Sequence, residues 1–127
     1  MKCMWYALLS SCLLVAGCAF DVIRVKQEPA VLDTSQSCAE TFVLSDSIQV
    51  TPKGGYQREL QQDTHWSCVG RIAQGSVFRS RDQILTAEAS NIYEANLVIS
   101  GRMIVGFYLP VESAFSPLDE PRPLLAR

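Results

Sequence analysis

The sequence contains few of the residues from which catalytic and metal sites are usually built. Its 127 residues include a single histidine, His65, and no Cys-x-x-Cys pair. A zinc site needs about four ligands at short spacings and a thioredoxin-like centre needs two neighbouring cysteines, so neither is expected. Cations are not in excess, since 11 Lys and Arg accompany 13 Asp and Glu for a formal charge of −2. Without surplus positive charge to neutralise phosphates, nucleic acid is not an expected partner.

Catalytic constellations are also scarce. Asp63, His65 and Ser67 are the residue types of a hydrolase triad, but on one extended strand His65 and Ser67 would merely share a face. No Gly-x-Ser-x-Gly turn is present to expose a nucleophile beside an oxyanion hole. We therefore predict a protein without enzymatic activity, cofactor or metal. A hydrolase that uses His65 and a carboxylate is the weaker alternative.

Paired carboxylates, which glycoside hydrolases use, are a second signal to weigh. The pairs close together in the sequence are Glu88 with Glu94 and Glu59 with Asp63. In a small chain with 13 acidic residues such pairs arise easily by chance, so they do not by themselves indicate a glycosidase.

A long hydrophobic run occurs only near the start of the chain. Lys2 is the only charged residue before Asp21, and residues 3–20 are apolar or small apart from Ser10 and Ser11. As a membrane-spanning helix this run is near the short end of the roughly 17–25 residues required. A basic start, a short apolar stretch and small residues also make up a cleaved signal peptide.

The residues Val15-Ala16-Gly17-Cys18 resemble the lipobox of bacterial lipoproteins. This resemblance implies that residues 1–17 are a signal peptide and that Cys18, the first mature residue, carries a diacylglyceryl group and a palmitate-type acyl chain. Because Ala19 follows the cysteine in place of aspartate, the family's sorting rule implies the periplasmic face of a Gram-negative outer membrane. The inner membrane is less expected, and an uncleaved helical anchor is the alternative to lipidation.

The cysteine count agrees with export. Of five cysteines, Cys3 and Cys12 would leave with the signal peptide and Cys18 would take the lipid. The remaining pair, Cys38 and Cys68, is expected to form a disulfide in an oxidising compartment. A metal pair or a redox pair is the less favoured alternative. On the chain-entropy model, a bridge closing a loop of this length stabilises a domain by roughly 3.5–4 kcal/mol.

Period-two alternation dominates the middle of the chain and predicts an all-β fold. The clearest hairpin runs from Tyr93 to Leu109 around a turn at Ser100-Gly101-Arg102. About seven short antiparallel strands are expected, in a small sandwich or barrel pinned by the disulfide. Within residues 82–95, several alanines and glutamates leave a short helix as an alternative.

The two ends of the mature chain are expected to lie outside the folded domain. Residues 18–37 contain Pro29 among scattered charges and are predicted to be a lipidated tether. Three prolines lie within residues 116–127, which should therefore form an extended or disordered tail without a continuous hydrogen-bond ladder. The β domain is accordingly predicted to be 38–115.

Only weak signals indicate a binding surface. Tyr108 is expected to face outward near Pro110, where it would either anchor a binding patch or pack under the C-terminal tail. Arg79 and Arg81 flank a turn, where they would touch lipid headgroups, a glycan or an acidic partner. The phrases Gln74–Val77, Glu94–Val98 and Val105–Pro110 resemble those of small Gram-negative envelope lipoproteins, a resemblance that implies no particular activity.

The sequence as a whole therefore predicts a membrane-anchored periplasmic lipoprotein. It is expected to be a non-enzymatic binding or assembly module for another envelope component, either a protein or peptidoglycan. The alternative is an inhibitor of a lysozyme-like cell-wall hydrolase, because lysozyme-inhibitor lipoproteins share the plan of a lipid, a short tether and a disulfide-pinned β-barrel.

Overall fold

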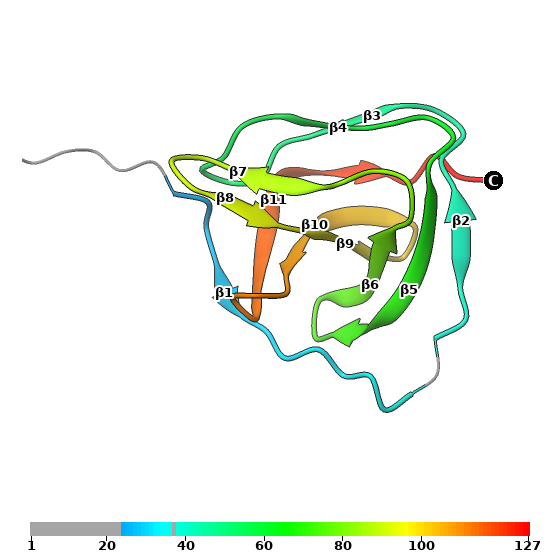
Figure 1. Cartoon of the computed structure of the whole chain (residues 1–127), viewed down its shortest axis with the longest axis horizontal. Helices are drawn as coiled ribbons and strands as arrows, with labels where there is room; N and C mark the ends of the chain where they lie inside the picture. The colour runs from blue at the N-terminus through cyan, green and yellow to red at the C-terminus, as the bar shows by residue number, and fades with distance from the viewer. Residues whose placement is uncertain (1–23, 37) are drawn as a thin grey trace, which may run out of the picture.

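The computed structural model describes residues 24–36 and 38–127 (Figure 1). The apolar run, the lipobox and Cys18 lie outside the described residues. All regular elements within the described ranges are strands, so the all-β prediction is confirmed. Among these residues no helix has the length and apolar character needed to cross a bilayer.

The strands form one large sheet and two small hairpins. The strands are β1 Glu28–Pro29, β2 Thr41–Val43, β3 Ile48–Val50, β4 Arg58–Leu60, β5 His65–Ile72, β6 Gly75–Ser80, β7 Thr86–Glu88, β8 Ile92–Glu94, β9 Asn96–Ser100, β10 Met103–Leu109 and β11 Ala114–Pro123. The seven-stranded sheet has the order β1-β11-β10-β9-β6-β5-β2, and all its neighbours are antiparallel. The hairpins β3–β4 and β7–β8 lie across one side of it (Figure 1).

The large sheet closes on itself, so of the two architectures predicted from the sequence the domain is the barrel and not the open sandwich. Val43 and Arg127 exchange two backbone hydrogen bonds of 2.9 and 3.2 Å, and Ser45 N donates to Leu125 O at 2.9 Å. The segment after β11 therefore lies along the far edge strand, β2. Register shifts in β5, between Cys68 and Gly70, and in β10 mark bulges of the kind that add local twist and bend a sheet toward closure.

The prediction that residues 116–127 form a tail outside the domain is wrong. Residues 114–123 make up β11, which pairs with β10 along most of its length. A proline loses only its own N–H, and its carbonyl still accepts: Lys53 N donates to Pro117 O at 2.9 Å. Between the prolines, Asp119 N donates to Thr51 O at 2.8 Å. β11 therefore accommodates three prolines while a proline carbonyl and an N–H between the prolines still pair with the segment around Thr51 and Lys53.

The prediction that the tether extends to residue 37 is also wrong, because the chain is packed onto the domain from residue 24. Val25 is buried in the core, and Glu28 and Pro29 pair with β11. Two glycines make room for this segment. At Gly54, with φ +77°, the carbonyl oxygen of Arg24 occupies the place of a side chain, and at Gly70 a Cβ would lie 2.7 Å from Asp33 O.

The apolar residues form two layers on opposite faces of the sheet. The larger cluster fills the barrel interior around Trp66, Leu97 and Phe107. A smaller cluster on the outer face contains Val98 and Tyr108 and is covered from outside by Ala30 and Leu32 of the N-terminal segment. The remaining outer members are Val69, Ile72, Val77, Val105 and Phe115. Strand β9 is buried on both faces for this reason, and burial of each large aliphatic side chain stabilises the fold by roughly 1.5–3 kcal/mol.

The disulfide Cys38–Cys68 is present, with the two Cα atoms 5.6 Å apart. It fastens the segment before β2 to the middle of β5. The alternative of a helix within residues 82–95 is wrong, because that interval holds the β7–β8 hairpin. The small side chain of Ala87 is fully buried in the core there, so tertiary packing outweighs the helical preference of alanine.

Candidate functional site

A cavity of about 500 Å³ lies at the end of the barrel where the β5–β6 and β9–β10 turns meet the start of β2 and the segment after β11. Its volume falls in the range typical of small-ligand sites, which are often found in the mouths of barrels. The lining residues are Glu40, Thr41, Phe42, Arg71, Gly75, Ser76, Phe78, Ile99, Ser100, Gly101, Arg102, Leu124, Ala126 and Arg127.

The apolar part of the cavity is built from the barrel core. Phe78 and Ile99 are buried, and Leu124 packs against the same core cluster. Phe42 stacks on Trp66 at a ring-centroid distance of 6.2 Å and meets Phe78 at 5.0 Å. Because stacked aromatic rings in a packed core have little rotameric freedom, this wall is already formed before any ligand arrives.

The charged part is dominated by arginine. Arg71 at the end of β5, Arg102 in the β9–β10 turn and Arg127 stand against one acidic residue, Glu40. Arg127 donates to Asp63 at 2.8 Å, whereas Arg71 and Arg102 make no ion pair within the described part of the chain. A surplus of cations here contrasts with the overall charge of −2. A planar guanidinium offers paired donors that match a carboxylate or a phosphate.

His65 forms hydrogen bonds with Asp82, a residue that was not predicted from the sequence to lie near it. His65 Nδ1 lies 2.7 Å from Asp82 Oδ2, and His65 N donates to the same oxygen at 2.8 Å. These two bonds, the side-chain one first, hold the pKa of Asp82 below its ordinary value of 3.8. Asp63, the acidic member of the triad considered above, is directed to Arg127 instead. The grouping Asp63–His65–Ser67 is therefore not assembled.

The acidic pairs that would suit a glycosidase are likewise engaged elsewhere. Glu88 forms an ion pair with Arg58 at 2.8 Å and accepts a hydrogen bond from Thr86 Oγ1 at 2.6 Å. Glu59 accepts a hydrogen bond from Gln49 Nε2 at 2.9 Å. The Arg58–Glu88 pair joins the β3–β4 and β7–β8 hairpins and so has a structural role. In the described ranges no group of three or more His, Cys, Asp or Glu is placed to hold a metal ion.

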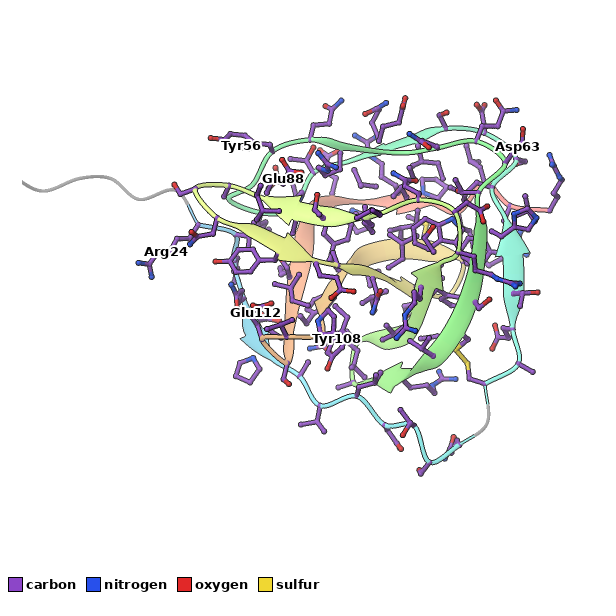
Figure 2. The ribbon with its side chains drawn as sticks, viewed as in Figure 1. Arg24, Tyr56, Asp63, Glu88, Tyr108 and Glu112 are labelled. Carbon is purple, nitrogen blue, oxygen red and sulfur yellow. A yellow bond between two sulfur atoms is a disulfide. The ribbon has the colours of Figure 1, made fainter. Side chains whose placement is uncertain are left out.

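The predicted binding patch is not formed as expected. Tyr108 does point to the outer face of the sheet, but only 4% of it is exposed, because Phe115 and Ala30 pack around it (Figure 2). It cannot anchor a surface contact. Arg79 and Arg81 are exposed, but they lie at the end of β6 and just beyond it, outside the cavity.

The three arginines that line the cavity are not among the site residues predicted from the sequence. Arg102 stands within the turn predicted at Ser100-Gly101-Arg102, and Arg71 shortly precedes Gly75, a residue that favours turns. Turns at the same end of a meander converge in space. That signal was available in the sequence. Arg127 had no such signal, since its place depends on closure of the barrel. Comparison of the chain with protein-family models, with curated proteins and with solved structures found no match.

Proposed function

We propose that this chain is a lipid-anchored, non-enzymatic binding module of the cell envelope and that the arginine-rimmed cavity is its binding site. The observation that carries the binding proposal is the combination, at the open end of the barrel, of a preformed apolar wall with two guanidinium groups that form no ion pair with any described residue. The lipobox resemblance at Cys18 and the disulfide between Cys38 and Cys68 support an exported protein.

The chemistry of the cavity selects a ligand with an acidic group and an apolar portion. Arg71 and Arg102 would bind the acidic group, and Phe42 with Leu124 would contact the apolar portion. Free carboxylates of peptidoglycan stem peptides fit this description, as does an acidic segment of an envelope protein. Peptidoglycan is the ligand to test first because it can be isolated as one chemical class.

The test is co-sedimentation of the purified protein with isolated peptidoglycan. Wild-type protein should sediment with it, and the double variant Arg71→Ala/Arg102→Ala should lose about 10- to 100-fold in affinity, since a charge-assisted hydrogen bond contributes roughly 1.5–3 kcal/mol. The matched control is Arg79→Ala/Arg81→Ala, which removes the same charge outside the cavity and should bind as wild type does. Equal loss in both variants would indicate nonspecific attraction and contradict the proposal.

The anchor is tested separately by the intact mass of protein extracted from membranes. A mass equal to residues 18–127 plus a diacylglyceryl group and an acyl chain is expected. A mass equal to the whole chain from Met1, without lipid, would mean that the protein is held by an uncleaved helical anchor and not by a lipid.

A further inference from the structure

Three segments of the chain converge at the point where the described residues begin. Gly54 packs directly against the backbone of Arg24, and Lys26 N donates to Lys53 O at 2.8 Å. Tyr56 N donates to Glu88 O at 2.8 Å, which brings in the β7–β8 hairpin. In Figure 2 the side chains of Arg24 and Tyr56 extend outward on the same side of the molecule.

This surface exposes apolar side chains beside cations. Tyr56 is 54% exposed, and Ile92, which pairs with Glu88 across the hairpin, is 70% exposed. Arg24 and Lys53 are exposed next to them. We refer to Arg24, Lys53, Tyr56 and Ile92 as the Arg24 face.

The acidic groups near the Arg24 face are partly neutralised. Glu88 is paired with Arg58 at 2.8 Å, and Glu28 lies 4.0 Å from Lys26. Glu112, in the turn between β10 and β11, lines a small hollow with Gln27 and Glu28 that includes none of the four residues of the Arg24 face. Glu94 lies at the far end of β8. An aromatic and an aliphatic side chain flanked by cations is the composition found where proteins contact phospholipid headgroups.

We propose that the Arg24 face rests on the phospholipid surface and that the cavity points away from it. This inference depends on the proposed lipid at Cys18. Arg24 follows Cys18 by six positions, so the connection spans at most about 20 Å even when fully extended. That is shorter than the diameter of a domain of this size, roughly 30 Å. The Arg24 face is therefore held at high effective concentration next to the membrane, where two exposed apolar side chains suffice for contact.

The same geometry leaves the cavity accessible. Arg24 lies at one side of the molecule in Figure 2, whereas β2 and the C-terminal Arg127, which contribute to the cavity, lie at the opposite side in the same view in Figure 1. A ligand on the far side from the bilayer could reach Arg71 and Arg102 without displacing the domain from the membrane.

Tryptophan reporters in the full-length protein test this orientation. The variants Tyr56→Trp and Ile92→Trp place an indole on the Arg24 face, and Ile84→Trp is the matched control. Ile84 is 86% exposed on the loop between β6 and β7, where its neighbour Gln83 bonds to Glu59 O and Gln61 N. Of the two native tryptophans, Trp5 leaves with residues 1–17 in the processed protein, and Trp66 is fully buried and gives a constant background. Each protein is extracted from membranes and reconstituted in phosphatidylethanolamine–phosphatidylglycerol vesicles whose acyl chains carry bromine, a quencher of indole fluorescence.

Both reporters on the Arg24 face should be quenched at least about threefold more strongly than the indole of the Ile84→Trp control, because an interfacial indole lies near the acyl chains. Equal quenching of all three reporters in lipidated protein would overturn the orientation and leave the lipid anchor standing. The intact mass of the same samples distinguishes the two failures, since a mass without lipid would overturn the anchor and this inference together. Far-ultraviolet circular dichroism of each variant verifies that the fold is retained.

Discussion

The backbones of Val43 and Arg127 exchange two hydrogen bonds, N to O at 2.9 and 3.2 Å, and this pair closes the sheet into a barrel. The same closure brings Leu124, Ala126 and Arg127 to the cavity. One contact therefore determines both the architecture and the shape of the candidate site.

Removal of residues 124–127 should open the barrel. The deletion eliminates the hydrogen bonds of Leu124, Leu125 and Arg127 to Arg102, Ser45 and Val43. We expect a loss of roughly 2–6 kcal/mol in the free energy of unfolding, because each backbone hydrogen bond contributes about 0.5–1.5 kcal/mol. Urea denaturation measures this loss. The control Arg127→Ala keeps the backbone pairing and removes only the exposed ion pair with Asp63, so it should cost less than about 1 kcal/mol.

Loss of the disulfide should lower stability by a similar amount. The Cys38→Ser/Cys68→Ser variant, or the wild type under reductant, should unfold with a free energy roughly 3.5–4 kcal/mol smaller, because the unfolded chain gains loop entropy. Denaturation midpoints with and without reductant provide the measurement. A midpoint that does not move would show that the bridge contributes nothing to stability.

The variants Gly54→Ala and Gly70→Ala should release the N-terminal segment. A Cβ at position 70 would lie 2.7 Å from Asp33 O, and one at position 54 would displace Arg24. Gly101→Ala is the matched control, since Gly101 has a positive φ of 55° but no neighbouring atom within 4 Å of a Cβ. We expect faster tryptic cleavage after Lys26 in Gly54→Ala than in Gly101→Ala. Equal cleavage rates would mean that the segment is held by other contacts.

The pair of His65 and Asp82 should make part of the stability depend on acid. Hydrogen bonds from His65 lower the pKa of Asp82 in the folded state below 3.8, so the ionised carboxylate stabilises the fold. This contribution is present above the unfolded pKa and is lost as the pH falls below about 4 through the folded pKa. Thermal unfolding between pH 7 and pH 2 should therefore show a smaller decrease for Asp82→Asn than for wild type. Hydrogen bonds from Ser35 also lower the pKa of Asp33. Asp33 therefore adds the same acid-dependent contribution to the stability of the wild type and of Asp82→Asn, and it does not affect the comparison.

A turbidity assay addresses the inhibitor alternative. If the chain is a binding module, added protein should not slow the lysis of cell walls by lysozyme. An inhibitor would insert a loop, and the exposed Ile84 between β6 and β7 is one apolar side chain placed to do so, as is Val111 in the β10–β11 turn. Slower lysis that is abolished by Ile84→Asp would favour the inhibitor over the binding module.

Local patterns in the sequence predict the strands well. Residues 107–109 alternate between the two faces as predicted, with Phe107 and Leu109 inside the barrel and Tyr108 outside it. This succeeds because side-chain alternation is a property of the strand itself. Nearer the turn the predicted phase is wrong, because the bulge between Ile104 and Gly106 places Ile104 inside and Val105 outside. The cysteine count identified the disulfide, since the expected processing leaves one pair.

Features that depend on distant partners were not predictable in the same way. The prolines of β11 suggested a tail outside the domain. The hydrogen bonds donated by the backbone N–H groups of Lys53 and Asp119, which hold this segment in the fold, are visible only in the structure. The segment from Arg24 looked like a tether because the space left by Gly54 and Gly70 is visible only in three dimensions. The cavity arginines come from separate parts of the chain and converge only when the barrel closes.

The central claim is that the arginine-rimmed cavity binds the acidic ligand. The most direct test is an NMR titration of isotope-labelled protein, residues 24–127, with soluble peptidoglycan fragments. We predict that the amide resonances that shift cluster at Arg71, at Ser100–Arg102 and at Arg127, and that Arg71→Ala/Arg102→Ala abolishes the shifts. Shifts confined to other surfaces, or none at millimolar fragment concentration, would contradict the account.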